Sequence, residues 1–246
     1  MPEFQDQFTQ VTRQFNHLTP GAILNDFVQL MCVLLSSPFF HNNLFKQAIS
    51  GSIYSDSRFG KSLNEQGQEH PADYAEMMNE LTRTYLTEVF SSEPFADILG
   101  AVYEQHSINI RKGQFFTPSS LATLLAEMHI DDANQHFQGE TSLSINDSSC
   151  GAGALLLAKL RKFHDAGGAK AIGSVEVYAN DIDLNLCRIT TVQILISSAL
   201  KKLPLRRFQI SNYDILKDLF NEECGNKVVY DWQYQGQQTE AMNENA

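Results

Sequence analysis

Two glycines separated by one residue, Gly151 and Gly153, lie where an apolar stretch ending at Asp147 passes into a helical pattern, in INDSSCGAGALLLA. Without a Cβ, such residues let a ligand approach the backbone, and the first turn of the following helix offers free N–H groups. The pattern therefore predicts a ligand-binding strand-turn-helix. The third glycine of the dinucleotide-binding G-x-G-x-x-G pattern is missing, so a tight turn without a ligand is an open alternative.

Acidic residues follow each of three predicted strands. Asp147 ends the first strand, Asp181 and Asp183 follow the second in YANDID, and Asp214 follows the third in SNYDIL. Ligands of open parallel sheets bind outside the carboxyl ends of the strands, so these carboxylates are expected to converge on one crevice. Asp147 is suited to accept a hydrogen bond from an ammonium group. An acid at the tip of the second strand is where nucleotide sites hold a ribose diol.

Two other kinds of site are excluded by spacing. The segment DIDLN matches the start of a calcium loop, but that loop needs Gly at its sixth position and Glu at its twelfth. This chain has Leu186 and Val192 at those positions. A P-loop of the form G-x-x-x-x-G-K-[ST] does not occur, which argues against phosphoryl transfer through that motif.

The elements that must position these residues follow from hydrophobic spacing after Gln114. Helical patterns there alternate with short apolar stretches typical of strands. Helices are expected at 119–128, 154–164 and 184–200, and strands at 143–146, 175–179, 208–211 and 228–230. This alternation predicts an α/β fold with a doubly wound, mostly parallel sheet.

The residues before Gln114 carry helical patterns alone. Helices are expected after Pro20, Pro71 and Pro94, because apolar residues recur there at helical spacing. Residues 50–70 are polar and aperiodic and are expected to form a long loop. Three parts are therefore predicted: an all-helical N-terminal region at 1–113, the sheet domain at 114–232, and a polar, disordered tail at 233–246.

The composition fits a globular protein with an acidic surface. The 246 residues include 18 Lys and Arg against 29 Asp and Glu, a net charge of −11, and 43% are hydrophobic. This length suits one medium α/β domain with an extra subdomain, and the hydrophobic content excludes a wholly disordered chain. Phosphate binding rests on Lys and Arg, so the acidic balance argues against the chain wrapping nucleic acid unaided.

The chain shows no sign of secretion or of a membrane segment. No basic start followed by an apolar run marks a signal peptide, and the most apolar stretch, residues 22–35, is too short and too polar to span a membrane. The cysteines form no CxxC pair, so neither a zinc site nor a disulfide framework is expected. A cytoplasmic location follows as the simplest expectation. The cysteines are Cys32, Cys150, Cys187 and Cys224.

Three segments in the order RKGQFFTPSSLATLLAEM, DSSCGAGALLLAKL and YANDIDLNLC resemble adenine-specific (N6) DNA methyltransferases, in particular methylase subunits of type I restriction-modification systems. FADILGAVYEQ resembles the end of the helical lead-in of that family. The similarity runs from about Phe95 to Asp214. It implies a Rossmann-like methyltransferase sheet, S-adenosylmethionine as cofactor, and methyl transfer to the exocyclic amine of adenine in DNA.

The resemblance also implies roles for individual residues. Asp181 would hold the ribose hydroxyls and Asp214 the adenine amine, and a Gln-aromatic-aromatic-Thr-Pro loop would fold over the methionine part. That loop is Gln114, Phe115, Phe116, Thr117 and Pro118, and the methionine end would be lined by Asp147, Cys150, Gly151 and Gly153. The family prefers Pro directly after the first acid, where this chain has Ser148.

This chain departs more seriously from the catalytic tetrapeptide of the family. The family uses [Asn/Asp]-Pro-Pro-aromatic after its fourth strand to accept the amine hydrogens and to stack on the flipped base. No two prolines are adjacent here, and the segment at that place is Asp231-Trp232-Gln233-Tyr234. Asp231 and Tyr234 are the catalytic candidates if this is a degenerate catalytic loop. We favour the alternative, an ordinary strand end leading into the tail.

The expected partners supply the DNA recognition for which this chain shows no domain. It ends twelve residues after Tyr234, so it is expected to be truncated relative to the family and to reach DNA only with a restriction-modification specificity or restriction subunit. Two function classes are open: an active adenine methyltransferase, or a catalytically impaired homologue acting as a regulatory, anti-restriction or partner subunit. A dehydrogenase is disfavoured by the missing glycine, and a protein or small-molecule methyltransferase by GQFFTP.

Basic residues cluster at a predicted helix-to-strand turn and could contact phosphate. A solvated surface is the interpretation that we favour, since such clusters usually keep a surface hydrated. The cluster comprises Lys201, Lys202, Arg206 and Arg207. Acidic residues are concentrated elsewhere, in the segment from Asn221 onward and among the four aspartates of the predicted crevice.

Overall fold

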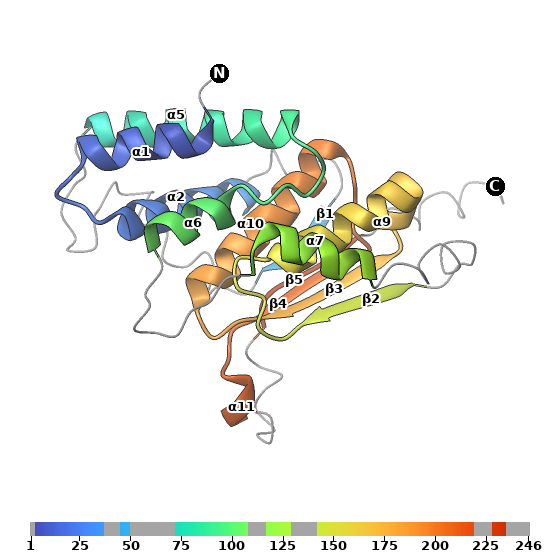
Figure 1. Cartoon of the computed structure of the whole chain (residues 1–246). Helices are drawn as coiled ribbons and strands as arrows, with labels where there is room; N and C mark the ends of the chain where they lie inside the picture. Colours follow the sequence, from blue (N-terminus) through green and yellow to red (C-terminus); the bar gives the residue numbers. More distant parts are fainter. Residues whose placement is uncertain are drawn as a thin grey trace, which may run out of the picture.

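The computed structural model describes residues 3–36, 45–49, 72–107, 117–128, 142–218 and 228–234 (Figure 1). Most of these residues lie in helices or strands. The helices are α1 (Phe4–Gln14), α2 (Pro20–Ser36), α5 (Ala72–Ser91), α6 (Leu99–Ser107), α7 (Ser119–Met128), α9 (Ala154–Ile172), α10 (Leu184–Lys201) and α11 (Ile215–Asp218). The strands are β1 (Phe45–Ile49), β2 (Leu143–Asp147), β3 (Val175–Asn180), β4 (Arg207–Ser211) and β5 (Val228–Tyr234).

The strands form one sheet in the order β1-β5-β4-β3-β2. The pairs β2–β3 and β3–β4 are parallel, whereas β5 is antiparallel to β4 and β1 is antiparallel to β5. Parallel neighbours need a crossover connection, and α9 and α10 provide the two crossovers. The predicted α/β class and the predicted strands β2, β3 and β4 are therefore confirmed. The described sheet is mixed rather than mostly parallel, because two of its four strand pairs are antiparallel.

The doubly wound arrangement is not seen in the described part of the chain. Strands β2, β3 and β4 follow one another across the sheet, so two right-handed crossovers place α9 and α10 on the same face. Figure 1 shows both helices on the side of the sheet that faces α2 and α6. Doubly wound sheets instead carry helices on both faces.

The two faces of the sheet differ in burial. Ile145, Val177 and Phe208 are paired across three strands and are buried on the helix-bearing face. On the opposite face Glu176 and Arg207 are paired and only half-buried. Strands covered on both faces are hydrophobic throughout, so this alternation indicates one buried and one solvated face.

Helix α10 lies at the centre of the molecule. It packs on β4 and on α2, α5 and α6, and its residues from Leu186 to Ser198 are all buried. The helical region and the sheet therefore share one hydrophobic core.

The prediction of an all-helical region through residue 113 is wrong at β1. The segment FKQAI alternates apolar and polar residues weakly, and it becomes a strand by pairing with β5, 179 or more residues later in the chain, as in Ile49 with Tyr230 and Phe45 with Tyr234. The predicted loop at 50–70 lies outside the described residues. Helix α1 was not expected, although Phe4, Phe8, Val11 and Phe15 are buried at helical spacing.

Two predicted boundaries also shift. Helix α9 continues past His164 to Ile172, with a break at Gly168, whose φ is 61° and ψ −147°. Strand β5 continues past Tyr230 to Tyr234, so the boundary at 232/233 falls within a strand. None of the described helices has the length and hydropathy needed to cross a membrane.

Candidate functional site

The turn between β2 and α9 requires glycine at two positions. Gly151 has a φ of 54° and Gly153, the N-cap residue of α9, has a φ of 94°, a region that L side chains rarely adopt. A Cβ on Gly153 would also lie 3.1 Å from Oγ1 and 3.2 Å from Cγ2 of Thr190. The glycines therefore let the turn pack closely on α10 and leave the first turn of α9 open to a ligand.

Asp181 ties this turn to the end of β3. Its Oδ2 accepts a hydrogen bond from Gly151 N at 2.9 Å, and its Oδ1 accepts one from Asp183 N at 2.8 Å. Burial raises the pKa of Asp181, and the nearby charges of Asp183 and Asp147 add to this, while the two N–H donors oppose it. Each carboxylate oxygen has a second lone pair, so Asp181 can still accept hydrogen bonds from a ligand.

Asn180 binds the loop that follows β2 and the loop that follows β4, a role that the sequence patterns did not indicate. Its Nδ2 donates to the carbonyl oxygens of Ser148 at 3.0 Å and Tyr213 at 3.2 Å, and its Oδ1 accepts from Tyr213 N at 3.2 Å. Its own carbonyl oxygen accepts from Cys150 N at 2.9 Å. The loops that follow β2, β3 and β4 are thereby joined at one edge of the sheet.

Asp147 and Asp214 lie on the outer two of these loops. Asp147 Oδ1 accepts from Ser149 N at 3.2 Å. Asp214 accepts from Leu216 N at 3.2 Å and from Lys217 Nζ at 3.2 Å, and the Lys217 hydrogen bond lowers the pKa of Asp214. The structure thus brings Asp147, Asp181 and Asp214 to the same edge, as the parallel strands predicted.

Apolar side chains are exposed beside these carboxylates. Ile182, between Asp181 and Asp183, is 67% exposed, and Leu216, two residues after Asp214, is 85% exposed. Exposed aliphatic groups beside hydrogen-bonding groups can pack against a flat ring. The edge therefore combines acceptors, open backbone N–H groups and apolar surface.

Cys150 packs under the turn. Its side chain is buried with Sγ 3.8 Å from Thr190 Oγ1, and burial raises the pKa of the thiol. A thiol that is buried and protonated is a poor nucleophile, and the predicted place of Cys150 at the methionine end of a cofactor site stays a prediction. Cys32 and Cys187 are free and buried as well.

The predicted loop over the ligand is described at its end alone. Pro118 O accepts from Ala122 N at 2.9 Å in the first turn of α7, and α7 packs on α9 through Ala122, Ala126 and Ala158. Thr117 and Pro118 therefore lie at the start of a helix anchored to the one that follows the glycine turn. Gln114, Phe115 and Phe116 lie outside the described residues.

Residues 95–243, more than half of the chain, match the family model of N-6 DNA methylases. This chain belongs to the N-6 DNA methylase family. The predicted resemblance to adenine N6 DNA methyltransferases is thereby confirmed, and the match covers the glycine turn and all three acidic strand ends. A comparison with curated proteins gives no significant match.

The two catalytic candidates lie away from that edge. Asp231 pairs with Gln209 in mid-sheet, and its carboxylate binds Arg207 through Nε–Oδ1 at 3.0 Å and Nη2–Oδ2 at 2.6 Å. Because β5 is antiparallel to β4, its carboxyl end with Tyr234 lies at the opposite edge from Asp214. The structure does not bring Asp231 and Tyr234 to the acidic loops, and their catalytic role stays a prediction.

The side chains of the basic cluster mostly contact groups within the chain. Arg206 Nε lies 2.9 Å from Glu176 Oε1, Arg207 binds Asp231, and Lys201 Nζ donates to the carbonyl oxygens of Phe90 and Ser92. These contacts favour the predicted solvated surface over a phosphate-binding face.

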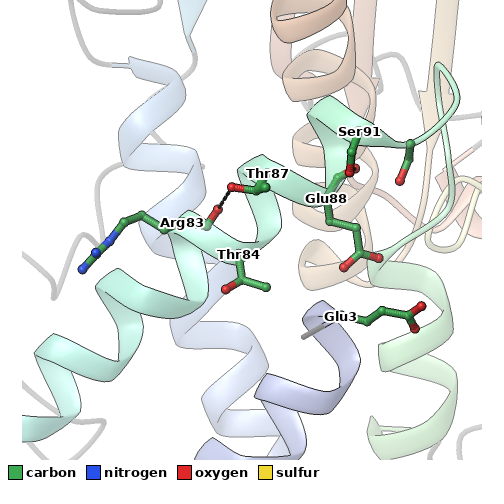
Figure 2. Close-up of a pocket in the computed structure, with 7 residues that line it drawn as sticks. Glu3, Arg83, Thr84, Thr87, Glu88 and Ser91 are labelled. Carbon is green, nitrogen blue, oxygen red and sulfur yellow. Dashed lines mark hydrogen bonds between the residues drawn. The ribbon is translucent and has the colours of Figure 1, made fainter. Parts of the chain in front are cut away.

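A pocket of about 510 Å³ lies in the helical region, away from the acidic loops. Figure 2 shows Glu3 at the start of α1 beside Thr84 and Glu88 on α5. Glu88 Oε2 accepts from Phe4 N at 2.5 Å, so it satisfies the first turn of α1. The cavity is a junction between two helices and contains none of the predicted ligand-binding residues.

The Arg207–Asp231 pair predicts a structural role for Asp231. Replacing Asp231 with Asn keeps the shape but removes the charge, and the free energy of unfolding is expected to fall by about 1 kcal/mol, since both side chains are about one-third exposed. Urea denaturation measures this, with Asp165→Asn on an exposed carboxylate as control. Unchanged stability together with lost methyl transfer would favour the catalytic role instead.

The contact of Gly153 with Thr190 predicts a coupled pair. Gly153→Ala is expected to lose less stability in a Thr190→Ala background than alone, by about 1 kcal/mol, because the shorter side chain makes room for the added Cβ. Urea denaturation of the double-mutant cycle measures the coupling. The control cycle uses Gly168→Ala, whose Cβ has no atom within 4 Å, and should be additive. Additive energies at Gly153 would contradict the crowding.

Proposed function

We propose that this chain binds S-adenosylmethionine at the edge formed by Asp147, Asp181 and Asp214. The observation that carries the proposal is the joining of three acidic strand ends to one glycine turn through Asn180 and Asp181. The ligand is cationic at its sulfonium and amine, and an edge with carboxylates fits those charges. Membership of the N-6 DNA methylase family independently favours this cofactor.

The groups of the cofactor match the groups of the edge. Its carboxylate would meet the free N–H groups at the first turn of α9, and its amine would donate to Asp147. The ribose hydroxyls would donate to Asp181. The adenine ring would pack between Ile182 and Leu216, which are exposed there, with its amine on Asp214. Thr117 and Pro118, with Gln114, Phe115 and Phe116, would close over the methionine part.

The reaction would be methyl transfer to the exocyclic nitrogen of adenine in DNA. When bound, the cofactor supplies a methyl group activated by its sulfonium. The chain's own residues would bind and orient the cofactor, and acceptors for the two amine hydrogens are needed beside a flipped adenine. Asp231 and Tyr234 are the candidates for these tasks only if β5 moves to present them at the acidic edge.

A second candidate function is favoured by one observation. Asp231 is bound by Arg207 in mid-sheet, so it does not face the acidic edge. A chain that binds the cofactor without this acceptor would be a catalytically impaired member of the family, acting as a regulatory, anti-restriction or partner subunit. Both candidates share cofactor binding and differ in methyl transfer.

DNA contact would depend on a partner subunit under either candidate. Three of the four cations of the basic cluster, Lys201, Arg206 and Arg207, contact acceptors within the chain, and phosphate contacts rest on free Lys and Arg. A specificity or restriction subunit of a type I system is the partner that we propose. The buried free thiols of Cys32, Cys150 and Cys187 fit a reducing cytoplasm.

Cofactor binding is tested with Asp147→Ala. Removing an acceptor for the amine is expected to weaken binding about tenfold, the equivalent of one charge-assisted hydrogen bond. Isothermal titration calorimetry with S-adenosylmethionine measures the dissociation constant. Asp165→Ala, on the exposed side of α9, is the matched control and should bind as the wild type does. Equal affinity in both variants would show that the edge is not the site.

Methyl transfer separates the two candidate functions. Labelled methyl from S-adenosylmethionine is counted on mixed-sequence DNA, with the chain alone and with candidate specificity subunits. The Asp231–Arg207 pair predicts no transfer by the chain alone. Robust transfer by the chain alone would identify an active enzyme, and unchanged transfer by Asp231→Ala and Tyr234→Ala would then exclude these residues from catalysis.

A further inference from the structure

One side of α10 carries three buried polar side chains at helical spacing. Thr190, Gln193 and Ser197 are 0%, 2% and 2% exposed, and positions three and four residues apart share a helix face. We call them the α10 polar row. Buried polar groups are costly unless they are hydrogen-bonded, so their partners indicate what the row is for.

The row binds the glycine turn through backbone carbonyls. Thr190 Oγ1 donates to Gly151 O at 2.8 Å, and Gln193 Nε2 donates to Ala152 O at 2.9 Å. These two carbonyls belong to the residues whose N–H groups and conformation shape the proposed ligand site. The row therefore supports the turn from the side opposite to the ligand.

The same row binds the segment that joins α5 to α6. Gln193 Oε1 accepts from Ile98 N and Leu99 N, both at 2.9 Å, and Ser197 Oγ accepts from Phe95 N at 2.8 Å. Gln193 Nε2 also donates to Asp97 Oδ1 at 2.9 Å. Residues 95–99 belong to the helical region, so the row joins that region to the glycine turn.

Gln193 is the member of the row that contacts both sides. Its amide makes four hydrogen bonds, two as donor and two as acceptor, which is its full capacity. Removing it leaves Ala152 O, two backbone N–H groups and Asp97 without that partner in a buried place. A buried network in which every donor and acceptor is paired fixes one arrangement of its side chains, whereas a network with unpaired groups does not.

We infer that Gln193 is a positioning residue for S-adenosylmethionine. It touches no part of the ligand and acts through Ala152, setting the glycine turn relative to segment 95–99. The inference rests on the proposed function. It makes the helical region support the cofactor site, because the Gln193 side chain that binds the turn is itself bound by the backbone N–H groups of Ile98 and Leu99.

The test uses the full chain and calorimetric titration with S-adenosylmethionine. Gln193→Ala is expected to weaken binding at least about tenfold, since the carbonyl of Ala152 loses its donor. Gln193→Glu keeps the size and the acceptor oxygens but loses the donor, so it should weaken binding similarly. Ser197→Ala loses one hydrogen bond to Phe95 alone and should have a smaller effect.

Ser198→Ala is the matched control. Ser198 is adjacent on the same helix and 1% exposed, but its Oγ donates to Leu203 O at 2.7 Å, away from the turn. It should lose stability and keep wild-type affinity within about twofold. Titrations are made at a temperature at which circular dichroism shows each variant to be folded, which separates affinity from stability.

The outcomes distinguish a failure of the proposed cofactor binding from a failure of the positioning role of Gln193 alone. Absence of binding by the wild-type chain would overturn the proposed function itself. Wild-type binding with Gln193→Ala and Gln193→Glu matching Ser198→Ala would overturn the positioning role alone. Wild-type affinity in Gln193→Glu would also overturn it, because the donor to Ala152 would then be unnecessary. If Gln193→Ala does not fold, Gln193→Glu and Ser197→Ala decide the matter.

Discussion

The burial of α10 is the constraint on which the rest of the structure depends. A helix enclosed on every side needs the sheet below it and α2, α5 and α6 around it, so neither layer covers its own apolar surface alone. The polar side chains of α10 must then find partners in those layers. Thr190, Gln193 and Ser197 find them in the glycine turn and in residues 95–99, which places the proposed ligand site where both layers meet.

The acidic edge results from the parallel pairing of three strands and from the residue type that follows each strand. Parallel pairing of β2, β3 and β4 aligns their carboxyl ends, and each strand is followed by an aspartate. Asn180 and Asp181 then link the three loops through hydrogen bonds to backbone groups. The result is a set of carboxylates that are partly satisfied from within and still able to accept from a ligand.

The hydrophobic periodicity and the alignment of parallel strands made most of the sheet and the acidic edge predictable from the sequence. Strands β2 to β4 and helices α7 and α10 lie within one residue of their predicted ends, because each has a clear apolar period. The aspartates were placed on one edge for the same reason. Asn180 and Gln193 were missed because their roles depend on partners far along the chain, which no local pattern encodes.

Strands β1 and β5 show where prediction from local sequence patterns fails. A five-residue segment such as FKQAI has too little pattern to be recognised, and its pairing partner lies near the other end of the chain. Asp231 was expected just after a strand ending at Tyr230, whereas it lies within β5, where it binds Arg207 of β4. Family motifs indicate which residues matter, whereas the pairing of strands decides where they lie.

The hydrogen bonds of Gln193 and Ser197 to residues 95–98 join positions 95 and 102 apart in the chain. Closing such long loops costs entropy before the contacts form, so contacts of this kind are made slowly during folding. The hydrogen bonds within helix α10, by contrast, join residues only four positions apart. The full support of the glycine turn therefore requires residues 95–99 to be packed against α10, so the proposed ligand site depends on contacts that close some of the longest loops of the chain.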